Sequence, residues 1–246
     1  MTAGEVFIPA RAPMLRALEL AKLAGEEGEV PVGAVVVRRG EIVGEGRNRR
    51  EADKNALCHA ELEAIHHACQ NLGGWRLWEC ELYVTLEPCP MCAGAIINAR
   101  IPQVVFGAYD QKAGSCGSIV DLYSLPYNHH PQVTSGFMEE EAAQLLSLFI
   151  GCVILAFGIS MEVAPNVLLV PGEGVVKALS KVCQKRFGTV KVVFDTSLIS
   201  ISFVLSFLFF HRLNGLGAGT VISALVVGKM VNICNHLPVI HKISAL

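Results

Sequence analysis

The spacing of apolar residues divides the chain into a part with helix and strand patterns and a part with long apolar runs. A stripe of apolar residues predicts a helix over residues 13–27, with Pro13 in its first turn and Gly28 just past its end. The apolar run at 32–37 and the segment 41–47 flank an Arg-Arg-Gly turn, which predicts a β-hairpin.

Further along, helix and strand patterns alternate. The predicted helices cover residues 59–70, 90–99 and 138–149, and the predicted strands cover 82–86, 103–106 and, more weakly, 133–135. Strands that alternate with helices are typical of a sheet covered on both faces. We therefore predict a three-layer α/β/α domain over residues 1–149.

The rest of the chain has the pattern of a membrane protein. Residues 142–161 are 20 residues without a charge, enough to span a bilayer. Residues 192–210, interrupted only by Asp195, and residues 213–228 are further candidate spans. A core helix of a soluble protein rarely stays apolar on all sides for this length. We predict a helical, membrane-embedded tail over 150–246, with a first span that begins near 142. A soluble helical domain is the alternative.

Charge and cysteine usage support this division. Residues 1–144 hold 12 Lys and Arg against 19 Asp and Glu, whereas residues 145–246 hold 8 against 3. The nine cysteines are an odd number, and charged residues fill the first 30 positions where a signal peptide would be apolar. We expect the first domain to be cytoplasmic, in a reducing compartment, and the full chain to be anchored in the cytoplasmic membrane.

Two short motifs in the first domain carry chemistry. The segment HAE at 59–61 and the segment PCPMC at 88–92 supply His59, Cys89 and Cys92, three zinc ligands that leave one tetrahedral position open for water. This H-x-E and P-C-x-x-C pattern is the signature of zinc nucleobase deaminases. We predict one Zn²⁺ per chain. Glu61 is expected to take a proton from the water that the metal activates and to pass it to the base.

Both motifs lie where helices are predicted to start. The partial positive charge of a helix N-terminus lowers the pKa of a thiol there, and thiolates are the form that binds zinc. The predicted fold and the predicted metal site therefore agree with each other.

The flanking residues resemble the bacterial tRNA-specific adenosine deaminases over about residues 10–149. The likeness is carried by GEVPVGAVVV at 28–37, LEPCPMCAGAI at 86–96 and FGAYDQKAG at 106–114. It implies a homodimer that converts the wobble adenosine of a tRNA anticodon stem-loop to inosine. The substrate-binding residues that it implies are Asn48 at the flipped adenine, Val30 and Ala60 in the pocket wall, Glu87 through its backbone, Asp110 and His129.

Two other functions stay open. Guanine and other nucleobase deaminases share both motifs, although the likeness to guanine deaminases is weaker over 106–118. A membrane protein whose deaminase-like domain only senses nucleotides is the second alternative; the intact motif residues favour an enzyme. The acidic first domain is unusual for a tRNA binder. Its basic residues cluster, however, around the hairpin and the mouth of the pocket: Arg38, Arg39, Arg47, Arg49, Arg50 and Lys54.

The tail is similar to the second half of an uncharacterised family of bacterial multi-helix integral membrane proteins. The likeness is carried by AFGI at 156–159, PGEG at 171–174 and FGTVKV at 187–192. We expect PGEG to lie in a loop between helices. Three full spans would place most of the tail's lysines outside the cell, against the positive-inside tendency. A re-entrant hairpin over residues 142–171 would remove that conflict.

Overall fold

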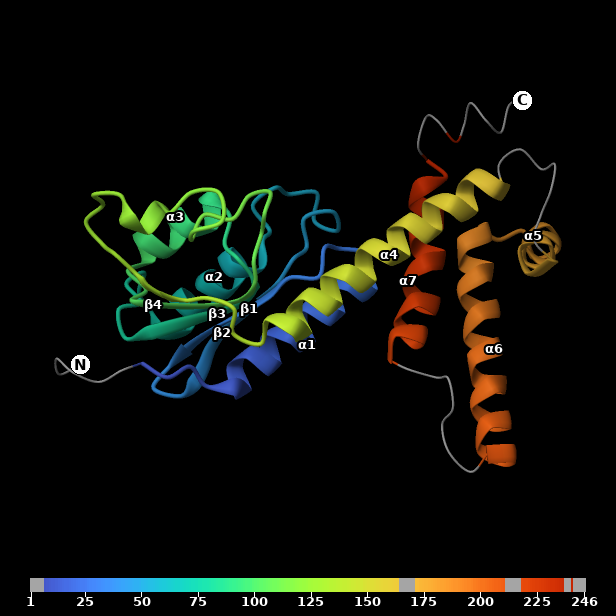
Figure 1. Ribbon diagram of the computed structural model, residues 1–246. Helices are drawn as coiled ribbons and strands as arrows, with labels where there is room; N and C mark the ends of the chain where they lie inside the picture. Colours follow the sequence, from blue (N-terminus) through green and yellow to red (C-terminus); the bar gives the residue numbers. More distant parts are fainter. Residues whose placement is uncertain (1–6, 164–170, 211–217, 237–239, 241–246) are drawn as a thin grey trace. The chain divides into compact units, whose positions relative to one another are not determined.

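The computed structural model describes residues 7–163, 171–210, 218–236 and 240. The chain forms two compact units, Met1–Leu146 and Ser147–Leu246 (Figure 1). The division falls inside the helix α4 (Glu139–Val163), which contributes its first turns to one unit and the remainder to the other.

The first unit is built on a mixed five-stranded sheet in the order β2-β1-β3-β4-β5. β1 is antiparallel to both of its neighbours, whereas β3, β4 and β5 are parallel. The elements before α4 are α1 (Arg11–Glu27), β1 (Gly33–Arg38), β2 (Glu41–Arg47), α2 (Ala60–Leu72), β3 (Cys80–Leu86), α3 (Pro90–Ala99), β4 (Gln103–Ala108), the short helix η1 (Leu122–Ser124) and β5 (Gln132–Thr134).

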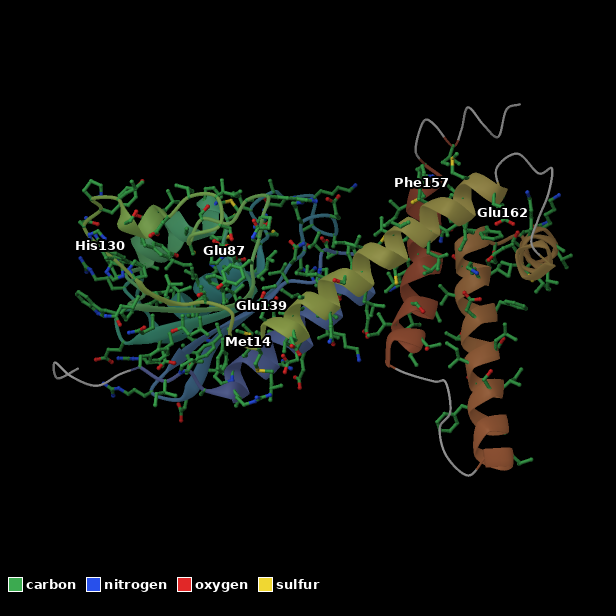
Figure 2. All side chains as sticks on the ribbon, in the orientation of Figure 1. Met14, Glu87, His130, Glu139, Phe157 and Glu162 are labelled. Atoms are coloured by element: carbon green, nitrogen blue, oxygen red, sulfur yellow. The ribbon has the colours of Figure 1, made fainter. Side chains whose placement is uncertain are left out.

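Helices cover both faces of this sheet. Val35 and Val37 of β1 pack on one side with Met14 of α1, which Figure 2 labels. Ala34 and Val36 pack on the other side, in the core that α2 and α3 complete. Successive side chains of a strand point to opposite faces, so a strand of consecutive buried valines needs a cover on each face. The predicted α/β fold class is confirmed for this unit.

The element bounds differ from the predicted ones by a few residues at several ends. β3 begins at Cys80 rather than at residue 82 because Cys80 pairs with Arg38 of β1. β5 begins at Gln132 because Gln132 pairs with Gln103 of β4 and its amide donates to the carbonyl oxygen of Pro102 at 2.8 Å. These limits are set by the neighbouring strand, which the local pattern of apolar residues does not reveal.

The position of α2 depends on a glycine in β2. A Cβ at Gly46 would collide with the carbonyl oxygen of Ala60 and lie 2.6 Å from the amide nitrogen of Ala64. Only glycine lets strand and helix approach this closely. The contact fixes the first turn of α2, where two of the motif residues lie.

The second unit consists of the remainder of α4 with α5 (Pro171–Cys183), α6 (Phe187–Phe210) and α7 (Ala218–Cys234). Its core joins Cys152, Ala156 and Ile159 of α4 to Val227 and Met230 of α7. Helices α6 and α7 meet at two glycines: Gly188 and the backbone of Gly228 touch, and the Gly188 amide donates to Asn232 Oδ1 at 3.0 Å. Small residues at a helix crossing allow this approach.

Two expectations for the tail need correction. The PGEG segment does not form a loop; it is the first turn of α5. A re-entrant hairpin over residues 142–171 does not fit either, because α4 continues without reversal to Val163. Of the third candidate span, residues 213–217 lie outside the described residues, and α7 begins at Ala218.

Two described helices are long and apolar enough to cross a membrane, judged by length and composition alone. They are α4 and the Phe187–Val204 part of α6. In their most apolar 18-residue stretches only 22% and 11% of the residues are buried. Several large apolar side chains of these helices are exposed, among them Ile150, Ile154, Val193 and Val204.

Candidate active site

The motif residues meet at the first turns of two helices that start beside each other on the same face of the sheet. His59 is the N-cap of α2, and Cys89 is the N-cap of α3; both have extended backbone. Pro90 follows at the first helical position, where its missing N–H costs no hydrogen bond. The two helix starts place the histidine and both cysteines together, as the sequence predicts.

The three donor atoms have the spacing that zinc requires. His59 Nδ1 lies 3.7 Å from Cys89 Sγ and 3.6 Å from Cys92 Sγ, and all three atoms lie within 4.8 Å of one another. Zinc bonds of about 2.3 Å to sulfur and about 2.0–2.1 Å to nitrogen, at a tetrahedral angle, separate nitrogen from sulfur by about 3.5 Å. His59, Cys89 and Cys92 therefore form a site for one zinc ion, which leaves a fourth position open.

The charge state of the thiols also suits a cation. The thiol of Cys92 donates a hydrogen bond to the sulfur of Cys89, and this contact, with help from His59, lowers the pKa of Cys89 to about 4 from the ordinary 9.0. Thiolate is the form of cysteine that binds metal.

Glu61 lies in the first turn of α2, two residues after the histidine, and is 4% exposed. Burial raises the pKa of its carboxyl group to about 7 from 4.5. A carboxyl group with a pKa near neutral pH accepts and releases a proton with little driving force in either direction, which is what a proton shuttle needs.

A cavity of about 230 Å³ joins these residues to most of the predicted substrate contacts. Its wall contains Val30, Asn48, Ala60, Glu87 and Asp110, with His59, Glu61 and Cys89. Val32, Leu86 and Ala113 also line the cavity and were not predicted to do so. Arg50, predicted at the mouth of the pocket, is part of the wall as well.

His129 does not line this cavity. Its Nε2 atom lies 2.8 Å from the carbonyl oxygen of Ile101, so the ring forms a hydrogen bond with the short connection between α3 and β4. A contact of His129 with the substrate stays a prediction, and it concerns RNA outside the base pocket.

The side chain of Glu87, which Figure 2 labels, organises the loop on one side of the pocket. It accepts backbone hydrogen bonds from Asp110 at 3.1 Å, Cys116 at 2.9 Å and Ser118 at 3.1 Å, and a further one from the Ser118 hydroxyl. Burial alone would raise the pKa of Glu87, but these donors outweigh it and lower the pKa. A role for Glu87 was predicted only through its backbone, whereas its side chain fixes the loop that carries Asp110.

A second buried carboxylate, Glu29, holds the opposite side of the pocket and was not foreseen. It is 1% exposed; its Oε1 accepts from the Ala52 amide at 2.7 Å, and its Oε2 accepts from Asn48 Nδ2 at 3.4 Å. Asn48 also donates to the carbonyl oxygen of Val30 at 3.3 Å. Glu29 thus fixes both the amide of Asn48 and the loop that follows it.

Replacing Glu29 by Gln should disturb substrate positioning without loss of zinc. The Gln side chain has one acceptor oxygen and would turn its NH₂ group towards one of the two donors. Hydrogen bonds to a charged group are worth about 1.5–3 kcal/mol, so we expect kcat/KM to fall by about 10- to 100-fold. Kinetics and zinc content are to be measured beside Glu19→Gln, an exposed acid on α1. Unchanged kinetics in Glu29→Gln would show that Asn48 needs no such support.

The predicted basic cluster does not gather at the mouth of the pocket. Only Arg50 lines the cavity, whereas Arg38 and Arg39 lie where β1 ends beside Cys80, at the other end of β3 from Leu86 in the cavity wall. The cluster is also paired with acids. All of its arginines make ion pairs, so its net charge is smaller than the sequence indicates. The pairs are Arg38–Glu79 at 2.6 Å, Arg39–Glu79 at 3.0 Å, Arg47–Glu27 at 2.8 Å, Arg49–Asp53 at 2.9 Å and Arg50–Glu51 at 3.2 Å. Exposed pairs of this kind contribute about 0–1 kcal/mol, so an RNA phosphate can replace the carboxylate at small cost.

Family models match both parts of the chain. The cytidine and deoxycytidylate deaminase zinc-binding region matches residues 9–108. A family of unknown function, DUF6198, matches residues 114–236 and so confirms the likeness of the tail to an uncharacterised family. The first 33 residues of that second match lie within the first structural unit.

Similar proteins agree on the first part. The tRNA-specific adenosine deaminase of Bacillus subtilis (strain 168) is 49% identical over 150 residues, which cover 61% of this chain and 89% of that protein. That of Streptococcus pyogenes serotype M18 is 42% identical over 137 residues, 55% of this chain and 86% of that protein. A solved structure from a study of A-to-I editing by tRNA:A34 deaminases matches with a TM-score of 0.55 and 44% identity, and covers 56% of this chain and all of that one.

The match to the deaminase zinc-binding region, residues 9–108, includes the three zinc ligands, Glu61 and Glu87. The chain therefore belongs to the tRNA-specific adenosine deaminase family through its first unit, and it continues into a region of the DUF6198 family.

Proposed function

We propose that this protein converts adenosine to inosine at the wobble position of a tRNA anticodon. The observation that carries the proposal is the cavity of about 230 Å³ in which Glu61 and Asn48 converge on the zinc ligands. A pocket this small accepts one base, which an enzyme of this kind takes out of its stack before the chemistry.

The residues of the pocket have distinct tasks in this reaction. Zinc, held by His59, Cys89 and Cys92, supplies Lewis-acid activation of a water molecule. Glu61 accepts a proton from the attacking water and delivers it to N1 of the adenine, next to the carbon that is attacked. It then transfers the second proton to the amino group, which leaves as ammonia. Asn48 holds the edge of the base, and Glu29 and Glu87 hold the loops on either side.

The purified full chain in detergent should deaminate an anticodon stem-loop with adenosine at the wobble position and leave free guanine almost untouched. A site that hydrogen-bonds one base discriminates strongly against another, so we expect a ratio in kcat/KM of at least about 100. Inosine in the RNA and released ammonia are to be measured, with Glu61→Gln protein as the blank. Faster turnover of guanine would assign the chain to the guanine deaminases. No turnover of either substrate by zinc-loaded protein would favour a nucleotide-sensing role.

We also propose that the deaminase domain, residues 1–149, forms a homodimer in the cytoplasm. Several large apolar side chains of this domain are exposed, as expected of a surface that a second copy covers. They are Leu57, Trp75, Trp78 and Ile119, each more than half exposed.

The tail, residues 150–246, is proposed to lie in the cytoplasmic membrane. The support comes from the two long apolar helices and from the exposure of their side chains. Ile150 and Ile154 of α4 and Val193, Ile201 and Val204 of α6 are each 54% to 67% exposed. Rows of exposed aliphatic residues on long helices suit a lipid environment and are costly in water.

The membrane proposal predicts how the chain fractionates. The full chain should sediment with membranes, resist extraction by alkaline carbonate and dissolve in detergent. A fragment of residues 1–149 should stay in the soluble fraction with its zinc and activity, because every proposed catalytic residue precedes the tail. Recovery of the full chain as a soluble dimer without detergent would mean that the tail is a soluble helical domain.

A further inference from the structure

Helix α5 carries an apolar stripe on its outer face. The stripe consists of Val175, Leu179 and Val182, whose spacing of four and then three residues places them on one side of a helix. Their exposed fractions are 48%, 40% and 81%. Val176, on another side of the helix, is fully buried and faces the rest of the second unit. α5 therefore packs through one face and presents a second apolar face outwards.

Basic residues accompany the apolar stripe. Residues 174–186, which include most of α5 and the connection to α6, hold three lysines and one arginine but no acid. Lys181, Lys185 and Arg186 form an exposed basic group, and none of them makes an ion pair with a described residue. An exposed apolar stripe beside an excess of positive charge is typical of a helix that lies on a membrane surface.

Two polar contacts hold α5 at the ends of the two candidate spans. Lys177 Nζ donates to the carbonyl oxygen of Val163, the last residue of α4, at 2.7 Å. Glu173 accepts a hydrogen bond from Lys191, near the start of α6, at 2.9 Å. Figure 1 shows α5 end-on, whereas α6 and α7 run lengthwise in the same view. α5 therefore lies across the end of the long apolar helices rather than along them.

This position and composition select an anionic lipid surface as the partner. An amphipathic helix at the end of a membrane span buries its apolar stripe at the boundary between headgroups and acyl chains. A group of about four Lys and Arg residues on such a helix binds anionic lipids. An RNA backbone would also attract the basic group, but it would leave the apolar stripe in water.

We propose that α5 is an interfacial helix that docks on an anionic phospholipid bilayer. The apolar stripe inserts at the level of the headgroups, and the exposed basic group contacts the lipid phosphates. The inference rests on the proposed membrane location of the tail and adds the class of lipid that the tail recognises.

Fluorescence quenching by brominated lipids tests this docking in the full chain reconstituted into vesicles. Val182→Trp places a reporter in the apolar stripe, at a position exposed enough to accept the larger side chain. Trp75 and Trp78 are the only tryptophans of the natural chain, so the reporter signal is the difference from wild-type protein reconstituted in the same way. The measured quantity is the binding constant of brominated phosphatidylglycerol relative to that of brominated phosphatidylcholine.

We expect phosphatidylglycerol to be preferred by about 10-fold or more, because each basic residue near an anionic surface contributes a factor of about 5. Lys181→Gln together with Lys185→Gln, added to the reporter chain, should lower this preference by at least about 5-fold. Lys22→Gln, an exposed lysine on α1, is the control and should leave it unchanged.

Three results would overturn the docking of α5. They are equal quenching by the two lipids, a reporter that neither lipid quenches in reconstituted protein, and a preference that survives both glutamine substitutions. If these substitutions instead weaken binding of the anticodon stem-loop while the lipid preference stays the same, the basic group serves RNA and the proposal is wrong. Failure of the full chain to float with vesicles would refute the membrane location of the tail and the docking with it. Flotation with an unquenched reporter would refute the docking alone.

Discussion

Turnover of the anticodon stem-loop is expected to fall by about 10²–10⁴-fold in Glu61→Gln, the range that general acid–base catalysis contributes. The substitution keeps the shape of the side chain but removes its ability to accept and release a proton. The wild-type carboxyl is well placed for that task, because burial at the start of α2 raises its pKa to about 7. Base binding should change much less, since Asn48 and the loop anchors are untouched.

Ammonia release and inosine formation measure this loss, and metal analysis tests its cause. Zinc content should remain at the wild-type level in Glu61→Gln, because Glu61 is not one of the three ligands. Glu63→Gln is the matched control: it lies two residues further along α2 and does not line the base cavity. Near-normal turnover in Glu61→Gln would refute the role of proton shuttle. An equal loss in Glu63→Gln would point instead to damage to the helix.

The grouping of His59, Cys89 and Cys92 could be predicted from the sequence because its determinants are local. The HAE and PCPMC segments each combine ligands with a helix start, and Pro90 marks one of those starts directly. The consecutive valines of β1 likewise indicate a strand covered on both faces. Where a signal lies within a few residues, spacing and residue type are sufficient.

The supports of the pocket could not be predicted in this way, since they join residues far apart in the chain. Glu29 reaches the amide of Ala52 across 23 residues, and Glu87 reaches Cys116 across 29. Glutamate side chains are usually exposed. The sequence alone therefore does not indicate that Glu29 and Glu87 are buried. The same holds for the arginines of the basic cluster, whose acidic partners lie as far as 41 residues away.

Helix α5 was missed for a related reason. Gly172 and Gly174 lower the intrinsic helix propensity of its first turn, so the local pattern favours a loop. The ion pair of Glu173 with Lys191 in α6 supplies a contact that propensity cannot show. Tertiary contacts of this kind often override weak local preferences.

Zinc should be lost from Cys92→Ser, and the stability of the deaminase domain should fall with it. A serine hydroxyl stays protonated at neutral pH and is a poor zinc ligand, whereas Cys92 is fully buried with its sulfur 3.6 Å from His59 Nδ1. The metal joins the starts of α2 and α3, so its loss releases both helix starts from each other. For a domain of this size, each kcal/mol of lost stability lowers the Tm by about 2–4 °C.

Metal analysis of purified protein and thermal unfolding with and without added zinc measure this effect. The wild-type chain should contain about one zinc ion, Cys92→Ser almost none, and added zinc should raise the Tm of the wild type alone. Cys69→Ser provides the control, because Cys69 is a thiol on α2 outside the metal site. Its zinc content should match the wild type. A Cys92→Ser protein with one zinc ion and an unchanged Tm would show that the metal is held by another set of ligands, and the deaminase mechanism would then lack its centre.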